Sequence, residues 1–122
     1  MNNVFLDKRI LIAEDDGALA AMLAADVREL GFTEVRTEFS LAGALVAVRE
    51  FRPAIALLDI VLTDGISLRV AEVLAGSGIP SVFMTGDAGA DAAHGLAVGS
   101  VLLKPFSPTQ LQEALIAGLT KH

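Results

Sequence analysis

The sequence predicts an α/β domain built on a five-stranded, doubly wound parallel sheet with helices on both faces. Short, continuous apolar runs, typical of strands buried on both faces, alternate with longer segments whose apolar residues recur at helical spacing. A chain that alternates strands and helices in this way pairs its strands in parallel. The 122 residues are a usual length for one domain, and no repeat or linker divides them, so we expect residues 1–122 to form a single domain.

Five segments are predicted to be the strands. Residues 10–13, 54–58 and 81–84 form short, continuous runs of the expected kind. The segment around Val35 and residues 101–103 carry the same signal more weakly.

Helical spacing occurs in three segments between these runs and in one after them. The apolar positions of the first three are Leu19, Met22, Leu23, Val27 and Leu30; then Leu41, Ala44, Leu45, Val48 and Phe51; then Ile66, Val70, Val73 and Leu74. The last helix is expected to begin at Ser107-Pro108-Thr109-Gln110, which combines an N-cap serine, a proline at the first helical position and a glutamine three residues after the cap. Residues 86–99 contain four glycines, and an interior glycine costs a helix about 1 kcal/mol relative to alanine. We therefore expect a short, weak or mobile helix there.

Other residues mark where the helices begin and end. Asp16 and Ser40 are predicted N-caps, and Gly31 and Pro53 are predicted to stop the first and second helices. For Asp16 the alternative interpretation is contact with a metal ion.

The composition excludes several classes of protein. Acidic side chains number 15 against 9 basic ones, the net charge is −6 and the pI is near 4.7, and no stripe of Lys or Arg indicates a nucleic-acid-binding face. An apolar content of 53% is too high for a disordered chain, and the lack of cysteine excludes disulfides, thiolate metal sites and a cysteine nucleophile. Neither a signal peptide nor an apolar span of about 20 residues occurs. We expect a cytoplasmic protein that binds neither nucleic acid nor a membrane.

Polar residues follow the predicted strands at the point where each strand ends. Glu14-Asp15-Asp16 follows the first strand, Asp59 the third, Thr85 the fourth and Lys104 the fifth. Ligands of open parallel sheets bind at this edge, so we expect the four acids to share one crevice, with Lys104 as the only base placed to meet them. Gathered carboxylates repel one another unless a cation binds, and a hard divalent ion such as Mg²⁺ resolves the repulsion.

The same residues suit phosphoryl chemistry. Asp59 could act as a carboxylate nucleophile that forms an aspartyl phosphate. Lys104 would then neutralise charge on the phosphoryl group, and the hydroxyl of Thr85 would hydrogen-bond another of its oxygens. Taken singly, Asp59 and Thr85 could be turn residues and Lys104 a solvated loop lysine. Their conjunction at separate strand ends favours a site.

Four motifs occur in a fixed order along the chain: Ile-Leu-Ile-Ala-Glu-Asp-Asp at 10–16, Ala-Leu-Leu-Asp at 56–59, Phe-Met-Thr-Gly at 83–86 and Leu-Lys-Pro-Phe at 103–106. With these motifs the chain resembles, over nearly its whole length, the receiver domain of two-component response regulators. The resemblance implies a flavodoxin-like (βα)5 fold with strand order 2-1-3-4-5 and no output domain.

The resemblance also implies roles for individual residues. Asp59 would be the phosphoacceptor, Thr85 the switch hydroxyl and Lys104 the phosphate-binding lysine, joined to Pro105 by a cis bond. The Mg²⁺ ligands it implies are the side chains of Glu14, Asp15 and Asp59 and the backbone carbonyl of Val61.

Three features depart from the common receiver pattern. Val101 occupies the position that usually holds a Tyr or Phe switch. Thr63-Asp64-Gly65 reaches its Asp-Gly about two residues early and lacks the usual proline, and the 19 positions from Thr85 to Lys104 are roughly three fewer than usual. Together with Phe83-Met84-Thr85-Gly86, these features resemble an atypical subfamily of stand-alone receivers with a reduced fourth helix. Its members tend to work with HWE-type histidine kinases.

Two functions remain as hypotheses at this point. The first is a single-domain phosphoacceptor, not an enzyme in its own right, that takes a phosphoryl group from a histidine kinase or phosphotransfer protein and contacts a downstream protein. The alternative is a pseudo-receiver, a binding module that acts without phosphorylation. A true phosphatase is disfavoured because Val61 stands where such enzymes carry a second aspartate.

Overall fold

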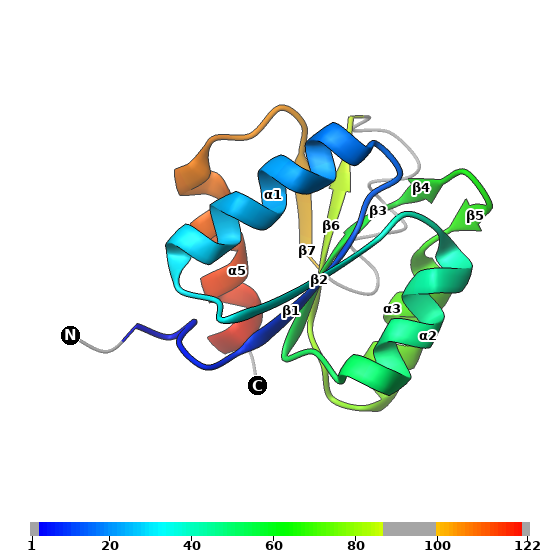
Figure 1. Cartoon of the computed structure of the whole chain (residues 1–122), viewed down its shortest axis with the longest axis horizontal. Coiled ribbons are helices and arrows are strands. Elements are labelled where there is room, and N and C mark those ends of the chain that lie inside the picture. Colours follow the sequence, from blue (N-terminus) through cyan, green and yellow to red (C-terminus); the bar gives the residue numbers. More distant parts are fainter. Residues whose placement is uncertain (1–2, 87–99, 121–122) are drawn as a thin grey trace.

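The computed structural model describes residues 3–86 and 100–120 and confirms the doubly wound parallel sheet (Figure 1). Its five strands pair in the order β2-β1-β3-β6-β7, all in parallel, which is the expected order 2-1-3-4-5 when the five predicted strands are numbered along the chain. Their bounds are β1 Arg9–Ala13, β2 Glu34–Glu38, β3 Ile55–Asp59, β6 Ser81–Thr85 and β7 Ser100–Leu103.

Four described helices cover the sheet: α1 Gly17–Leu30, α2 Leu41–Phe51, α3 Leu68–Gly76 and α5 Pro108–Thr120. Figure 1 shows α1 and α5 on one face and α2 and α3 on the other. None of these helices is long and apolar enough to span a membrane. The weak fourth helix expected within residues 86–99 lies, except for Gly86, outside the described residues.

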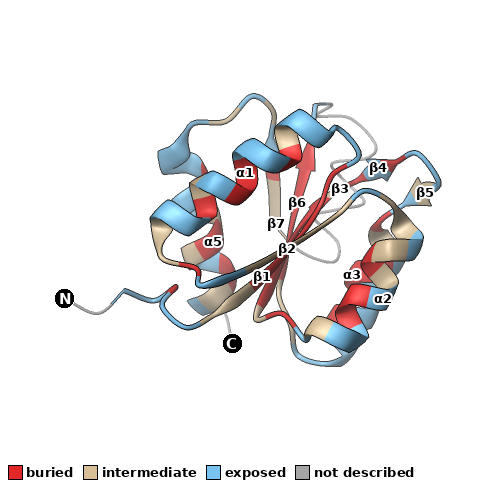
Figure 2. Cartoon of the chain, in the orientation of Figure 1, coloured by how far each residue is buried: buried red, intermediate tan, exposed pale blue. Residues whose placement is uncertain are grey.

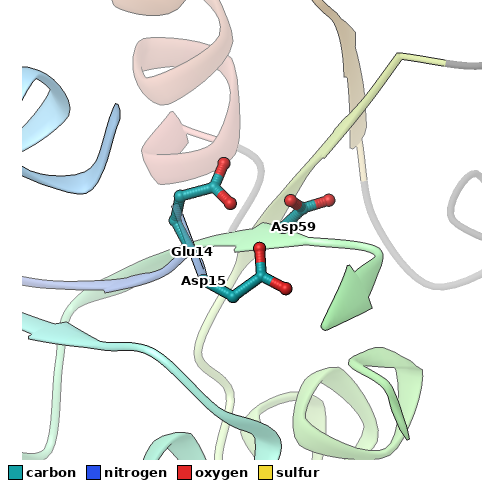
Figure 3. Close-up of side chains that lie close together, drawn as sticks. All are labelled: Glu14, Asp15 and Asp59. Carbon is teal, nitrogen blue, oxygen red and sulfur yellow. The ribbon is translucent and has the colours of Figure 1, made fainter. Parts of the chain in front are cut away.

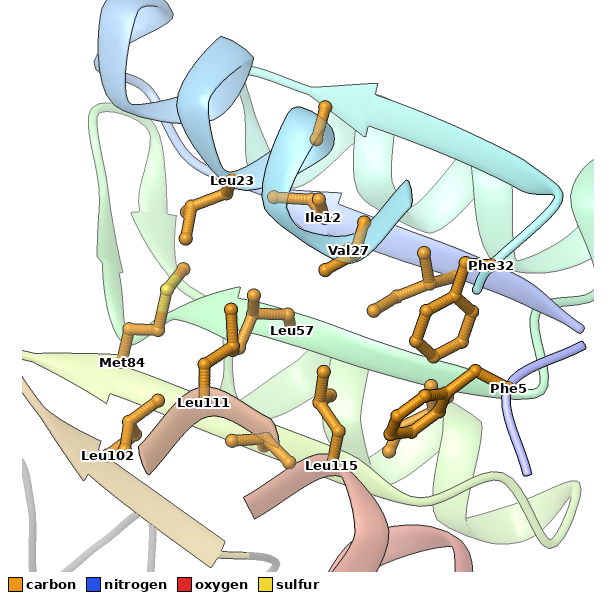
Figure 4. Close-up of a cluster of buried hydrophobic side chains, with 14 residues drawn as sticks. Phe5, Ile12, Leu23, Val27, Phe32, Leu57, Met84, Leu102, Leu111 and Leu115 are labelled. Atoms are coloured by element: carbon orange, nitrogen blue, oxygen red, sulfur yellow. The ribbon is translucent and has the colours of Figure 1, made fainter. Parts of the chain in front are cut away.

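Each central strand contributes to two cores because successive side chains of a strand point to opposite faces. On β1, Ile12 faces the α1/α5 side, where it packs in the cluster drawn in Figure 4, and Leu11 faces the α2/α3 side. On β3, Leu57 and Leu58 divide in the same way. All four are fully buried, and Figure 2 shows the middle strands buried along their length. Burial on both faces explains why these strands are continuous apolar runs.

The predicted caps are present. The carboxylate of Asp16 accepts a hydrogen bond from the backbone N–H of Leu19 at 3.1 Å. At the start of α2, the hydroxyl of Ser40 accepts one from the N–H of Gly43 at 3.0 Å. The side chains of Ser107 and Gln110 each accept a hydrogen bond from the other's backbone N–H, which forms the reciprocal capping box expected from the sequence.

The prediction that Ile66 belongs to the third helix is wrong. Ile66 lies in β5 (Gly65–Ile66), which pairs antiparallel with β4 (Val61–Leu62), and α3 begins only at Leu68. Ile66 precedes Val70 by four positions, which matches helical spacing, but it belongs to the two-strand hairpin that comes before the helix. Gly65 closes this hairpin with a φ of +149°, which lies outside the range of a right-handed helix.

The two-faced core makes a prediction about stability. Leu57→Ala should lower the free energy of unfolding by about 2–5 kcal/mol, because it opens a cavity in the middle strand of the sheet. Val73→Ala, at a half-exposed position on α3, should cost about 0.5 kcal/mol or less. Urea unfolding followed by far-ultraviolet circular dichroism measures both, since the chain has no Trp or Tyr for fluorescence. Equal losses in the two variants would contradict this description of the core.

Candidate functional site

Three carboxylates meet at the carboxyl edge of the sheet. Glu14 and Asp15 directly follow β1, and Asp59 ends β3, the strand paired with β1. The N–H of Glu14 donates to the carbonyl of Glu38 at 3.0 Å, which extends the β1–β2 ladder by one residue and fixes the backbone beneath the site. One oxygen from each carboxylate lies within 4.8 Å of the other two, and Figure 3 shows the three side chains converging.

A single ammonium group bridges two of these acids. Lys104 directly follows β7, and its Nζ lies 2.8 Å from Oε1 of Glu14 and 3.1 Å from Oδ2 of Asp59. The side chains of Glu14 and Asp59 are 2% and 14% exposed, so both ion pairs are largely withdrawn from solvent. Lys104 is the only base that pairs with these acids within residues 3–86 and 100–120, as expected.

The backbone of Lys104 is held where the ammonium can reach across the sheet. Its N–H donates to the carbonyl of Thr85 at 2.8 Å, and the bond to Pro105 is cis, as the resemblance implies. Thr85 is the buried last residue of β6, between β3 and β7 in the sheet. The structure therefore brings Thr85 to the same edge as Asp59 and Lys104.

Burial and charge shift the proton affinities in this cluster. Burial raises the pKa of Glu14 above its ordinary value, and the neighbouring Asp59 adds to the rise, while the hydrogen bond from Lys104 opposes it. Burial on its own would lower the pKa of Lys104, but the hydrogen bonds to Glu14 and Asp59 outweigh it and the pKa is raised. Lys104 thus stays charged at neutral pH, and its one positive charge faces more carboxylates than it can neutralise.

Asp15 is in a different environment from the other two acids. It is exposed, and the hydroxyl of Thr63 donates to its Oδ2 at 2.8 Å. This hydrogen bond lowers the pKa of Asp15 below its ordinary value, so the side chain is ionised at neutral pH. Metal ligands must be deprotonated, and Asp15 meets that condition.

The donor set suits a small, hard divalent cation. Mg²⁺ takes oxygen ligands, keeps several of its waters and is usually held by one or two carboxylates. Three carboxylate oxygens close together, one of them on a solvent-facing side chain, supply this arrangement. Val61, the expected backbone ligand, lies at the start of β4, two residues after Asp59.

Asp16 does not join the cluster that we expected it to share. Its carboxylate is used as the N-cap of α1, so the acids that gather are Glu14, Asp15 and Asp59. The prediction that Asp16 is a helix N-cap is confirmed. The first N–H groups of a helix have no partner within the helix, so a carboxylate at the N-cap position is favoured as their acceptor.

Two polar side chains near the site, those of Thr63 and Asp64, were not predicted from the sequence to have a role there. Besides Thr63, the carboxylate of Asp64 accepts hydrogen bonds from the N–H groups of Leu41 at 2.7 Å and Ala42 at 3.2 Å. Asp64 therefore caps α2 from outside the helix, and these bonds lower its pKa. The early Thr63-Asp64-Gly65 was visible in the sequence as a departure from the common receiver pattern. The groups that Thr63 and Asp64 bind lie more than 20 positions away along the chain, so no local pattern indicated these contacts.

No family model matches the chain, but individual proteins do. The DNA-binding response regulator MtrA of Mycobacterium tuberculosis is 37% identical over 119 residues, and MtrA of Mycolicibacterium smegmatis is 39% identical over 120 residues. Each alignment covers 94% of this chain and 52% of the relative, so the chain spans about half the length of the curated relatives it matches.

Solved structures share the fold across nearly the whole chain. A CheY-like response regulator receiver domain protein from Methanospirillum hungatei superposes with a TM-score of 0.82 at 26% identity, covering 92% of this chain and 93% of that one. The HemR receiver domain from Leptospira biflexa gives 0.81 at 25% identity, covering 95% and 97%. In sequence, in fold and in the side chains at the sheet edge, this chain is similar to the receiver domains of two-component response regulators.

Proposed function

We propose that this chain is a single-domain response regulator that accepts a phosphoryl group onto Asp59 in a Mg²⁺-dependent reaction. The donor is the phosphohistidine of a sensor histidine kinase or of a phosphotransfer protein. The observation that carries the proposal is the Lys104 ammonium, shared between Asp59 and Glu14 beside a third, ionised carboxylate. Receiver domains bind Mg²⁺ at an acidic pocket, and Glu14, Asp15 and Asp59 form such a pocket here.

The phosphoryl transfer is a displacement at phosphorus. A carboxylate oxygen of Asp59 forms the new P–O bond while the P–N bond to the donor imidazole breaks, and the imidazole nitrogen takes up a proton as it leaves. Later hydrolysis of the acyl phosphate restores the carboxylate and releases inorganic phosphate. The chain thus assists its own phosphorylation and dephosphorylation without being an enzyme that acts on a separate substrate.

Lys104 is placed to stabilise the charge that develops on the phosphoryl oxygens. An ammonium has three N–H donors, and within the described part of the chain the side chains of Glu14 and Asp59 use two of them. We assign the third donor to a phosphoryl oxygen and the Thr85 hydroxyl to another. Bound Mg²⁺, held by Glu14, Asp15, Asp59 and the Val61 carbonyl, would supply the positive charge that one lysine cannot.

The departures from the common receiver pattern support assignment of the chain to the atypical subfamily. Val101 packs, partly buried, on the α2/α3 face, and a branched aliphatic side chain cannot act as a rotating aromatic switch. Because the chain also carries Phe83-Met84-Thr85-Gly86, we propose that it belongs to the stand-alone subfamily that works with HWE-type kinases. The reduced fourth helix that belongs to this pattern falls on residues outside those described.

We further propose that this domain acts in the cytoplasm through protein contacts, relaying or draining a phosphoryl signal. The net charge of −6 disfavours direct contact of the domain with a nucleic-acid backbone. DNA binding is named for the MtrA relatives, which are about twice as long as the matched region. The pseudo-receiver alternative is not favoured, because the lysine and the three acids of the site keep their mutual contacts.

Phosphorylation of Asp59 can be tested directly. Incubation with Mg²⁺ and a small-molecule phosphodonor should add one phosphoryl group per chain, measured by intact mass spectrometry, and Asp59→Asn should abolish the addition. Asp26→Asn is the matched control, since Asp26 lies on α1 and makes no side-chain hydrogen bond or ion pair with the described residues. A wild-type protein that stays unmodified, or an Asp59→Asn protein that is still modified, would overturn the assignment.

Metal binding makes a separate prediction. At neutral pH, Mg²⁺ should raise the melting temperature, because a ligand held only by the folded state adds about 2.7 kcal/mol at about 100 times its dissociation constant. Asp15→Ala should remove most of this rise, and Asp26→Ala should not. Differential scanning calorimetry with NaCl at matched ionic strength separates metal binding from charge screening. A melting temperature independent of Mg²⁺ in the wild type would refute the metal site.

A further inference from the structure

The hairpin of β4 and β5 is held at two points by side chains of its turn. Its strands pair Val61 with Ile66 and Leu62 with Gly65, so Thr63 and Asp64 form a two-residue turn. The Thr63 hydroxyl donates to Asp15, and the Asp64 carboxylate accepts from the first two N–H groups of α2. The turn therefore spans the distance between the acidic cluster and the start of a helix.

Thr63 restrains the exposed side chain of Asp15 through a direct hydrogen bond. Asp15 is the exposed member of the acidic cluster, whereas Glu14 and Asp59 are fixed by burial and by Lys104. The Thr63 hydroxyl donates to Oδ2 of Asp15 at 2.8 Å, and this hydrogen bond is the largest cause of the lowered pKa of Asp15. Hydrogen bonds to ligating carboxylates set their orientation and change metal affinity by about 10- to 100-fold.

Asp64 in turn fixes the position of Thr63. Adjacent residues in a two-residue turn cannot move independently, because the paired strands on either side fix both ends of the turn. Asp64 is bound through both carboxylate oxygens to α2, at 2.7 and 3.2 Å. Ser40 caps the same helix independently through Gly43, so α2 keeps one cap when Asp64 is replaced.

We propose that Thr63 is a positioning residue for the metal site, and that the Thr63-Asp64 turn couples Mg²⁺ binding at Asp15 to the N-terminus of α2. The inference rests on the proposed function, since it takes Mg²⁺ as the ion bound by the acidic cluster. It adds a site residue that lies outside the metal ligands, and it connects the metal to a helix that contributes none of them.

The test is a Mg²⁺ titration of the full chain followed by ¹H–¹⁵N NMR without a phosphodonor. In the wild type, the amide signals of Leu41 and Ala42 should shift along with those of residues 14 and 15. Thr63→Val, which keeps the branched shape and removes the hydroxyl, should weaken Mg²⁺ binding about tenfold. It should also abolish the Leu41 and Ala42 shifts even at saturating Mg²⁺.

Three further variants make the result specific. Thr63→Ser restores a hydroxyl and should recover most of the affinity. Asp64→Ala should weaken Mg²⁺ binding in the same direction as Thr63→Val, through the loosened turn. Thr120→Val is the matched control: its hydroxyl donates to the Ile116 carbonyl on α5, and its loss should leave the titration unchanged.

The outcomes separate this inference from the proposed function. The wild type and Thr63→Val could bind Mg²⁺ with equal affinity and show the same shifts of the Leu41 and Ala42 amide signals. That result would overturn the role of Thr63 and leave the metal site standing. Unchanged affinity in Asp64→Ala would overturn the coupling to α2. A wild type that binds no Mg²⁺ would overturn both the metal site and this inference.

Discussion

The structure at the sheet edge depends on one imbalance of charge: among residues 3–86 and 100–120, three carboxylates meet a single ammonium. Lys104 lies within hydrogen-bonding distance of Glu14 and Asp59, while Asp15 relies on a neutral hydroxyl. Removing ions from water costs several kcal/mol each unless they are paired, so Glu14, nearly fully buried, requires the lysine. The remaining negative charge is what a divalent cation would offset. The phosphoryl transfer to Asp59 that we propose would use the same arrangement, because the lysine that pairs with the acid can also pair with a phosphoryl group.

The scaffold fixes this arrangement through the register of its strands. Glu14 follows β1 and Asp59 ends its parallel neighbour β3, while the Lys104 N–H, just after β7, donates to the carbonyl of Thr85 at the end of β6. The strands are buried on both faces, so a shift of one residue would exchange their two core faces. The core therefore keeps the charged groups in place, although none of the charged groups belongs to it.

Much of the fold and of the site could be predicted from the sequence, because the patterns that indicate strands, helix starts and strand ends are local. Apolar runs marked the strands, cap residues such as Ser40 marked helix starts, and strand ends marked Glu14, Asp59 and Lys104. What could not be predicted depends on contacts between distant segments. Asp64 caps a helix that begins 23 positions before it, and Thr63 bonds Asp15 across 48 positions. The roles of these two turn residues became apparent only once the hairpin was placed against α2.

The most direct test of the central claim is a double-mutant cycle between Lys104 and Glu14, measured as the free energy of unfolding at neutral pH without divalent cations. Lys104→Met should destabilise the fold by about 3 kcal/mol, the low end for breaking a buried pair. Glu14→Gln should destabilise the wild type, because the neutral amide loses the ion pair, but should stabilise the Lys104→Met protein, because it removes an uncompensated buried charge. Additive effects, with Glu14→Gln costing the same in both backgrounds, would contradict the claim that this lysine holds the acidic edge together.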